Sequence, residues 1–423
     1  MKKIIFSFAW LCFCGAVFSQ ETLRLTLKEA QEYAMQHNKT VLNAGLSVSE
    51  AQKRTWEIIA AGLPQANATV NYQNMMGFSM SFAGMHIAMP PTSNFQATVT
   101  QLLFSASYWV GIKMSKIGEG LTDIARQQSE LDVRHQTQTA YFAALVTQEN
   151  LKILEKNLKN IETIAKSAED LVRIGVAEQT DADQLKVQVL MMNNVIKSIE
   201  RSIELAYNLL RFQLGVEADT KIVLTQTLEE LFTQKNPQGM LVKDFDLNSN
   251  YTVQLLDGQI DLATKQISLE RAAAMPNVAA FYSYTYKIAR STFDMSPNNV
   301  IGLQVNIPLL ASGQRYSRTQ QAKIKLDKAQ NNRDMLAESL LLQEKQLRFN
   351  LNSAIETLAL QKEAMSVAER VFESVTRKFQ HGTASSLDVT TANTSLLQAQ
   401  GNYINAMMEV CTAQSELEKL FNN

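Results

Sequence analysis

Residues that could bind a metal ion are concentrated in one short segment of this chain. Five methionines and one histidine lie there, at Met75, Met76, Met80, Met85, His86 and Met89. Thioether sulfurs suit soft ions such as copper, so the segment Met75–Met89 could form a copper site. The alternative, which we favour, is that these side chains form an apolar rim and an external loop without a metal.

The other candidate ligands and nucleophiles do not form a recognisable site. The four histidines, His37, His86, His135 and His381, have no metal-ligand spacing with one another or with a cysteine. Cys411 is the one cysteine beyond the first 19 residues, and its apolar neighbours predict a buried structural thiol. The sequence has no phosphate-binding loop, nucleophile elbow or kinase motif. We therefore expect no enzymatic activity, no cofactor and no resident metal.

Residues 1–19 have the pattern of a secretory signal peptide. Lys2 and Lys3 precede the apolar run Ile4–Val17, and Ser19 ends a small-residue cleavage pattern. The formal net charge is −1, and loss of the two lysines would lower it to about −3. A nucleic-acid-binding protein would carry a clustered basic excess, so we expect no nucleic-acid partner.

The second half of the sequence repeats the first. A shift of 212 positions places residues 38–72 on residues 250–284 without a gap. Identical residues then meet at Asn38, Thr40, Val41, Ala51, Lys53, Ala60, Ala61, Pro64 and Tyr72. This predicts a duplicated fold, with repeat 1 over residues 20–215, an equatorial linker over 216–247 and repeat 2 over 248–423.

Each repeat is predicted to run helix, strand, strand, very long helix, tight turn, helix. Thr26 and Glu29 form a capping-box pattern that begins a helix extending to about Gly62. The long helices are predicted near Tyr108–Ile174 and at Gln314–Gln380, and each would span about 100 Å. Their return helices are predicted at Gln179–Leu214 and Ser386–Phe421.

Apolar residues in the long helices are spaced by three and four. In the first long helix they are Leu154, Leu158, Ile161, Ala165, Ala168 and Val172. This spacing predicts a coiled-coil seam. The summed length of the short helices nearly matches the long one, which predicts that they lie end to end beside it. The linker loses this periodicity and is expected to form a small α/β patch.

Four segments between the helices alternate apolar and polar residues. Their apolar face would include Val70, Tyr72, Phe95, Val99, Tyr282, Tyr284, Leu303 and Val305. Such alternation is typical of transmembrane barrel strands, although a half-buried soluble sheet has the same period. Four strands cannot close a barrel in lipid, so copies of the chain would have to pool strands, eight from two copies or twelve from three.

Several motifs, in this order and spacing, resemble the outer membrane efflux protein (TolC) family. They are LTLKEAQEYAMQHN from Leu25, AAGLPQANATVNY from Ala60, VTQLLFSAS from Val99, VNIPLLASG from Val305 and HGTASSLDV from His381. The resemblance covers essentially the whole chain after the signal. It implies a mainly α fold with a membrane β-barrel portion: a homotrimer with a 12-strand outer-membrane β-barrel and a 12-helix α-barrel in the periplasm.

The resemblance also implies partners and sites. A periplasmic adaptor (membrane fusion protein) would dock at the helical turns around Gly175, Val176, Gly382 and Thr383. Acids beyond the turns of such proteins form rings at the periplasmic aperture, which here points to Asp388, Asp181 and Asp183, with Thr391 replacing an acid. Acids at these positions also suit a helix N-terminus, so a capping role is the alternative.

The predicted function is a passive exit duct of a tripartite efflux or type I secretion system. It would lie in outer-membrane lipid and receive substrate from an inner-membrane transporter of the RND, ABC or MFS type. The alternative is a soluble periplasmic coiled-coil scaffold or adaptor. The sequence does not separate drugs, metal ions and proteins as substrates.

Overall fold

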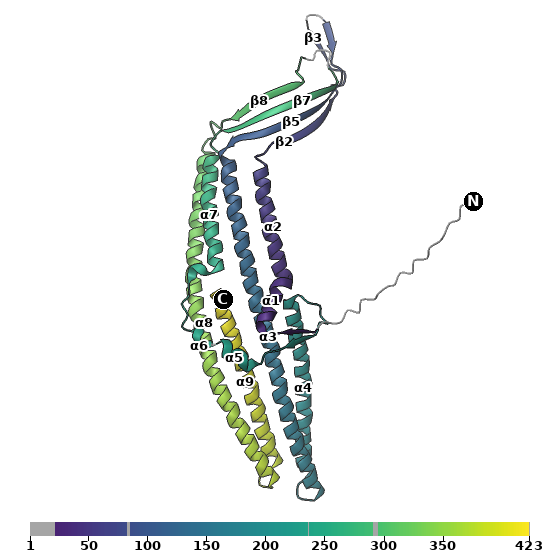
Figure 1. Cartoon of the computed structure of the whole chain (residues 1–423), viewed down its shortest axis with the longest axis vertical. Coiled ribbons are helices and arrows are strands. Elements are labelled where there is room, and N and C mark those ends of the chain that lie inside the picture. The colour runs from purple at the N-terminus through teal and green to yellow at the C-terminus, as the bar shows by residue number, and fades with distance from the viewer. Residues whose placement is uncertain (1–21, 83–84, 236, 291–294, 423) are drawn as a thin grey trace, which may run out of the picture. The chain divides into compact units, whose positions relative to one another are not determined.

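The computed structural model describes residues 22–82, 85–235, 237–290 and 295–422, and it is mainly helical (Figure 1). The predicted signal peptide lies outside the described residues. The described helices include none that is long and apolar enough to cross a membrane. The mainly helical fold class predicted from the sequence is confirmed.

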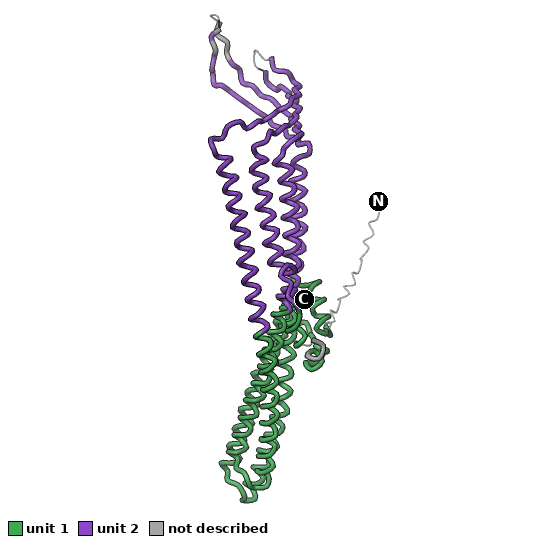
Figure 2. Tube along the Cα trace, turned by 90° about the vertical axis from the view of Figure 1, so that its left-hand side faces the viewer, with its two compact units in different colours: residues 1–39, 133–243, 349–417 green, residues 40–132, 244–348, 418–423 purple. Residues whose placement is uncertain are grey.

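The chain divides into two compact units, each of which contains segments from both halves of the sequence (Figure 2). Unit 1 comprises residues 1–39, 133–243 and 349–417. Unit 2 comprises residues 40–132, 244–348 and 418–423. The long helices α3 (Ala106–Arg173) and α8 (Gln314–Gln380) contribute residues to both units.

Two helical hairpins form most of unit 1. The end of α3 turns into α4 (Gln179–Leu214), and the end of α8 turns into α9 (Ser386–Leu420). All four helices contribute to one apolar cluster, which contains Ile161, Ile164, Ala165, Ala168, Ala182, Leu185, Phe372, Phe379, Val389, Ala392 and Leu396. The predicted seam of α3 is therefore confirmed. Five of its six members are buried in this cluster or packed against it, and Leu154 is buried in a second cluster with Met192 and Ile196.

Unit 1 also contains a small α/β patch formed by distant segments. Strand β1 (Leu23–Leu25) pairs in parallel with β6 (Ile222–Leu224). The short helices α5 (Leu228–Lys235) and α6 (Pro237–Met240) follow. The phenol of Tyr141 on α3 is fully buried and donates to the carbonyl oxygen of Leu25 at 3.0 Å, which attaches the patch to the helices.

The predicted single helix from Thr26 to Gly62 is wrong, because the chain forms α1 (Leu27–His37) and α2 (Lys39–Ala60). Thr26 and Glu29 do form the predicted capping box. Asn38 separates the helices in an extended conformation with φ −64° and ψ 127°. Its buried amide donates to the carbonyl oxygen of Gln213, in the last turn of α4, at 2.7 Å. The break therefore satisfies a carbonyl that a helix end leaves without an intrahelical partner.

Asn250 makes the corresponding contact in unit 2. It precedes α7 (Tyr251–Ala272) with φ −68° and ψ 125°, after the short 3₁₀ helix η1 (Leu247–Ser249). Its amide donates to the carbonyl oxygen of Leu420 at 3.1 Å. Asn38 and Asn250, which correspond under the shift of 212 positions, thus bind the C-terminal carbonyls of α4 and α9.

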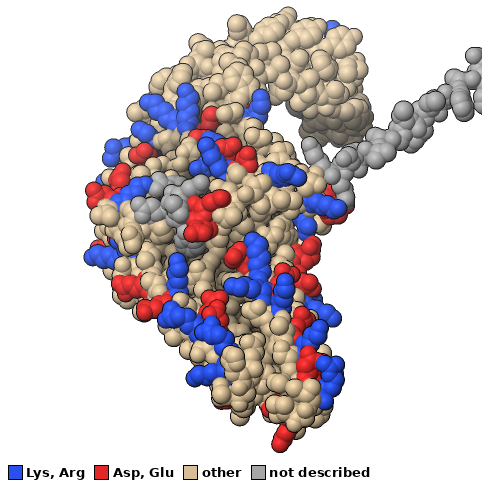
Figure 3. All heavy atoms as spheres, turned by 60° about the horizontal axis from the view of Figure 1, so that its bottom comes forward, with Lys and Arg blue, Asp and Glu red and all other residues tan. Residues whose placement is uncertain are grey.

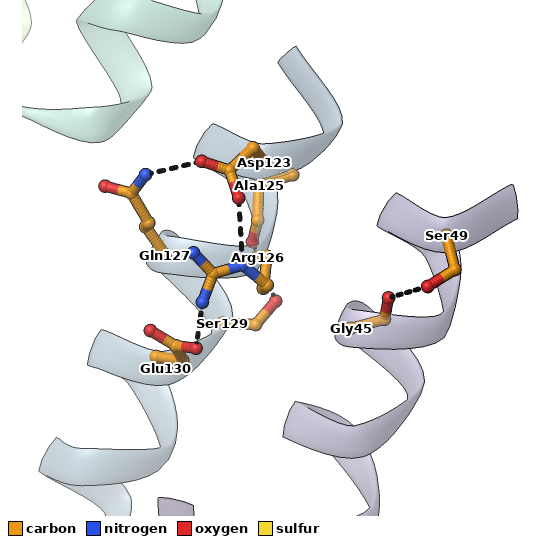
Figure 4. A network of polar contacts seen from close by, with 8 residues as sticks. All are labelled: Gly45, Ser49, Asp123, Ala125, Arg126, Gln127, Ser129 and Glu130. Atoms are coloured by element: carbon orange, nitrogen blue, oxygen red, sulfur yellow. Dashed lines mark hydrogen bonds and ion pairs between the residues drawn. The ribbon is translucent and has the colours of Figure 1, made fainter. Parts of the chain in front are cut away.

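In unit 2, α3 is stabilised by polar contacts along one helical face (Figure 4). Asp123 accepts from Arg126 Nε at 3.0 Å and from Gln127 Nε2 at 2.9 Å, and Arg126 also pairs with Glu130. The Arg126 hydrogen bond is the main cause that lowers the pKa of Asp123. Such pairs, three or four residues apart, support an exposed helix by a few tenths of a kcal/mol each, ~0.2–0.5.

Four antiparallel strands form the sheet of unit 2, in the order β2-β5-β7-β8. Their bounds are β2 (Gln65–Gln73), β5 (Thr92–Ser105), β7 (Asn277–Ala289) and β8 (Asn299–Asn306). The central pairing of β5 with β7 joins the two sequence halves. A separate hairpin of β3 (Ser79–Phe82) and β4 (Met85–Ala88) was not predicted.

Candidate functional site: the sheet faces and the two helical turns

The register of the sheet places the predicted lipid-facing residues on one face. Val70 opposes Phe95 and Val99 opposes Tyr282, so these side chains point the same way. Strand alternation extends this face to Tyr72, Tyr284, Leu303 and Val305. All eight side chains are exposed, from 37% for Phe95 to 69% for Tyr72 and Leu303. In a half-buried soluble sheet, other parts of the protein would cover such a face. No described residue of unit 2 covers this one.

The opposite face of the sheet is mainly polar. Ser283, which is 5% exposed, accepts from Gln96 Nε2 at 2.8 Å and lies 3.2 Å from the hydroxyl of Thr98. Within β2, β5, β7 and β8 there is one charged side chain, Lys287, and its pairing with Asn94 places it on this polar face. The strand region is accordingly almost free of charge, whereas the helical surfaces in view carry interspersed acids and bases (Figure 3).

The two helical turns of unit 1 have the same hydrogen-bond geometry. Gly175 has φ +78° and Gly382 has φ +69°, the left-handed conformation that favours glycine. The amide of Gly175 donates to Val172 and that of Val176 donates to Leu171, at 3.0 and 2.9 Å. At the other turn, Gly382 donates to Phe379 and Thr383 donates to Lys378, both at 2.9 Å. This is the Schellman pattern of a helix C-terminus, and it leaves both turns exposed.

Apolar side chains project at these turns. Ile174 and Val176 are each 67% exposed, and Leu387 is 62% exposed. Ala177 and Ala384 are half-buried beside them. The turns therefore present a small hydrophobic surface at the ends of the two helical hairpins.

Asp388 caps the first turn of its own helix. Its carboxylate accepts from the backbone N–H of Ser385 at 2.9 Å and from the Ser385 hydroxyl at 2.8 Å. These bonds, the backbone one first, lower the pKa of Asp388. The side chain is nevertheless fully accessible to solvent, so a capping role leaves its charge exposed. Thr391 lies one turn further on and donates to the carbonyl of Leu387 at 2.9 Å.

Asp181 has a second role that sequence reasoning missed. It accepts from the backbone N–H of Glu178 at 3.4 Å, as a cap does, and it also accepts from the hydroxyl of Ser386. Ser386 is 1% exposed and also contacts Gln184 Oε1 at 3.0 Å. These contacts join the two hairpins of unit 1 beside their turns. Asp183 does not take part and instead accepts from Gln179 at 3.0 Å.

The described part of the chain contains no group of three or more His, Cys, Asp or Glu side chains placed to hold a metal ion. In the methionine segment, Met75 and Met76 are exposed by 46% and 92%. The side chains of Met80, Met85 and His86 lie outside what the structure describes. The described residues therefore test neither the favoured apolar rim nor the alternative of a copper site.

The chain is similar to known outer-membrane proteins in sequence and in fold. TolC of Vibrio cholerae is 23% identical over 406 residues, covering 93% of this chain and 90% of the relative. The solved structure of the outer membrane protein VceC of Vibrio cholerae has a TM-score of 0.72 at 15% identity, and covers 94% of this chain and 96% of that one. The Campylobacter jejuni CmeC outer membrane channel has a TM-score of 0.74 at 13% identity, covering 94% and 85%.

The chain thus shares the fold of these solved outer-membrane proteins. The model of the outer membrane efflux protein family matches residues 30–216 and 247–423, and the chain belongs to this family. The function predicted from the sequence, an outer-membrane channel for efflux, is confirmed at the level of the family. The family is one of channel proteins and not an enzyme class. Membership also favours the duct over the alternative of a soluble periplasmic scaffold or adaptor.

Proposed function

We propose that three copies of this chain form the exit duct of a tripartite efflux or type I secretion system. The observation that carries the proposal is the sheet of unit 2, which has one exposed apolar face and two edge strands. Among the described residues β2 pairs with β5 alone and β8 pairs with β7 alone. Edge groups need partners in lipid, and pooling the sheets of three copies would supply them in a closed 12-strand barrel.

The helices would continue the barrel as a 12-helix tunnel in the periplasm. The duplicated order of helix, two strands, long helix and return helix, with repeats over residues 20–215 and 248–423, gives each copy two coiled coils for such a tunnel. The corresponding contacts of Asn38 and Asn250 support this duplication. The segment over residues 216–247 would form the equatorial patch between the repeats.

The turns at Gly175–Val176 and Gly382–Thr383 are the proposed docking points for a periplasmic adaptor. Their exposed backbone and the apolar side chains of Ile174, Val176 and Leu387 suit an α-helical hairpin partner. The adaptor would connect the duct to an inner-membrane transporter of the RND, ABC or MFS type. Exchange of Val176 for aspartate should weaken adaptor binding without changing trimer assembly, and co-purification measures both.

Asp388, Asp181 and Asp183 are the proposed acids of the periplasmic aperture, with Thr391 at the position where the family resemblance implies a further acid. Three-fold symmetry would turn each acid into a ring of like charges around a narrow bore, which favours cations. Because Asp388 also caps α9, two variants separate its roles. Asp388→Ala removes the cap and the charge, whereas Ser385→Ala weakens the cap and keeps the charge. A ring predicts reduced cation selectivity in Asp388→Ala alone, and an equal effect of both variants contradicts it.

The duct itself is tested by purification from outer-membrane fractions. We expect a heat-modifiable trimer in detergent and stepwise conductance in planar lipid bilayers. A stable monomer in plain buffer without detergent would overturn the proposal and restore the soluble scaffold. The substrate class, whether drug, metal ion or protein, is a separate question because a water-filled duct is a general passage.

A further inference from the structure

Asn393 on α9 is a buried polar residue without a partner. It is 0% exposed, and neither Nδ2 nor Oδ1 of its amide has a hydrogen bond within the described residues. Nearly all buried polar groups in proteins are hydrogen-bonded, because an unpaired one loses its hydration without compensation. An amide with both ends unpaired therefore requires a physical explanation.

Two hydroxyls at the same level of the hairpin share this property. The Oγ1 atoms of Thr390 and Thr376 are buried and have no partner among the described residues. Thr390 precedes Asn393 by three positions, which places both on one face of α9. Thr376 on α8 and Thr390 on α9 each lie four residues from the helix end at the connecting turn.

The neighbouring hydroxyls of α9 behave differently. Thr391, Thr394 and Ser395 each donate to the carbonyl one turn earlier, at 2.9–3.0 Å. This local bond is the usual solution for a helical hydroxyl. Its absence at Thr390 sets that hydroxyl apart from those around it.

The surroundings of these three residues are apolar. Phe372 and Phe379 flank Thr376 along α8, and Val389, Ala392 and Leu396 belong to the same buried cluster on α9. Asn393, Thr390 and Thr376 thus lie along their helices between members of this four-helix apolar cluster, and we refer to these three residues as the polar layer. A polar residue in a coiled-coil seam lowers the stability of the packing.

We propose that this polar layer is a built-in hinge of the α8–α9 hairpin. In the packing seen here the three groups are unpaired, which makes this packing only weakly favourable. A small shift of α9 against α8 that admits water to the layer would pair them. The hairpin then has two packings of similar free energy, and a small input at the turn can select between them.

The inference rests on the proposed duct and specifies how one part of its aperture moves. Gly382 and Asp388, the proposed docking and aperture residues of this hairpin, lie on the turn side of the polar layer. A hinge at this level would let the turn move while the rest of α9 stays packed. A shift of 207 positions aligns Asp388 with Asp181 of the other hairpin. Under this shift Thr390 and Asn393 correspond to the charged residues Asp183 and Lys186, so the polar layer is specific to α8–α9.

The test compares two buried asparagines of unit 1. Asn393→Leu removes an unpaired amide from an apolar site. Asn157→Leu is the matched control, because Asn157 is 2% exposed but donates to Gln400 Oε1 at 3.2 Å. We expect backbone amides of residues 386–400 to exchange hydrogen about tenfold more slowly in Asn393→Leu, since one unpaired buried amide is removed. Asn157→Leu should instead speed exchange, because it leaves Gln400 unpaired.

Conductance of the reconstituted trimer supplies the functional readout. With the layer made apolar, we expect the open fraction of Asn393→Leu channels to fall about tenfold, in step with the slower exchange. Thr390→Val, a smaller change of similar shape, should shift both readouts in the same direction. This variant keeps the proposal testable if the leucine does not fit.

Three results would decide against the proposal or its basis. Exchange in Asn393→Leu at or above the wild-type rate shows that the amide is already satisfied, and it overturns the hinge. Slower exchange with an unchanged open fraction overturns the link between the layer and opening. No conductance from the wild-type trimer overturns the duct itself, and the exchange comparison then reports on the polar layer alone.

Discussion

Asp388 shows how one residue can serve both a helix and a proposed aperture. Its carboxylate caps α9 through Ser385, and these hydrogen bonds lower its pKa. A lowered pKa means that the charged form is favoured in the folded state. The stabilisation is therefore complete above the ordinary aspartate pKa and is lost as pH falls through the lowered one.

The first prediction follows from the lowered pKa of Asp388. Below the ordinary aspartate pKa, the first turn of α9 should begin to fray, and the amides of Ser385 and Asp388 should lose protection beyond the intrinsic pH effect. Hydrogen exchange over a pH series measures this. The variant Asp388→Ala, already without the cap, should show no such loss over the same range. A pH-dependent loss in both proteins would assign the effect to another group.

Asn38 carries the second prediction. Its buried amide donates to Gln213 at the end of α4, so Asn38→Ala leaves that carbonyl unpaired. We expect a loss of about 1–3 kcal/mol of stability. Asn43→Ala, at an exposed position of α2, should change stability by less than about 0.5 kcal/mol. Denaturation midpoints of the two variants decide whether the amide contact stabilises the break between α1 and α2.

At the scale of elements, long helices and tight turns set the geometry of unit 1. The α8–α9 hairpin reverses over a few residues because Gly382 takes a positive φ of 69°. Gly401 within α9 has no positive φ, and open space surrounds the position of its missing Cβ. Glycine is therefore required at the turn and unfavourable in the helix.

The third prediction uses this contrast. Gly382→Ala should destabilise the hairpin by about 1–2 kcal/mol, since an L residue is strained in the left-handed region. Gly401→Ala should stabilise α9 by up to about 1 kcal/mol because alanine is the better helix former. In thermal unfolding, the midpoint should fall for Gly382→Ala and rise for Gly401→Ala. A gain in stability for Gly382→Ala would contradict the role of the turn.

For the whole molecule, the exposed apolar face of the sheet is what supports the proposed insertion into a membrane. Its apolar face is exposed over all four strands, and its polar face holds the single strand charge. A barrel formed from three copies would turn the apolar face to lipid and the polar face to the lumen. Alternate residues of one strand would then meet opposite environments.

The fourth prediction compares two neighbours on β8. Leu303→Arg places a charge on the apolar face, at a cost of about 2–4 kcal/mol per copy near the bilayer midplane. Gln304→Arg places the same charge on the polar face and should be tolerated. The fraction of heat-modifiable trimer in outer-membrane extracts measures both. An equal loss of trimer in the two variants would mean that one face does not meet lipid while the other meets the lumen.

Local pattern was sufficient for most elements of the fold. The seam of α3, the capping box at Thr26 and the bounds Gln179–Leu214 and Gln314–Gln380 follow from periodicity, caps and glycine breaks, which are local signals. The faces of the strands also follow, because alternation fixes which side chains share a side. The duplicated sequence indicated which elements correspond.

Contacts between distant segments were decided only by the tertiary structure. The break at Asn38 depends on a carbonyl 175 positions away, and the pairing of β1 with β6 joins strands of three residues each, too short to show a pattern. The contact of Asp181 with Ser386 and the unpaired amide of Asn393 likewise arise from packing between hairpins. Periodicity determines which face of an element is buried, whereas polar partners depend on which elements meet and at what level.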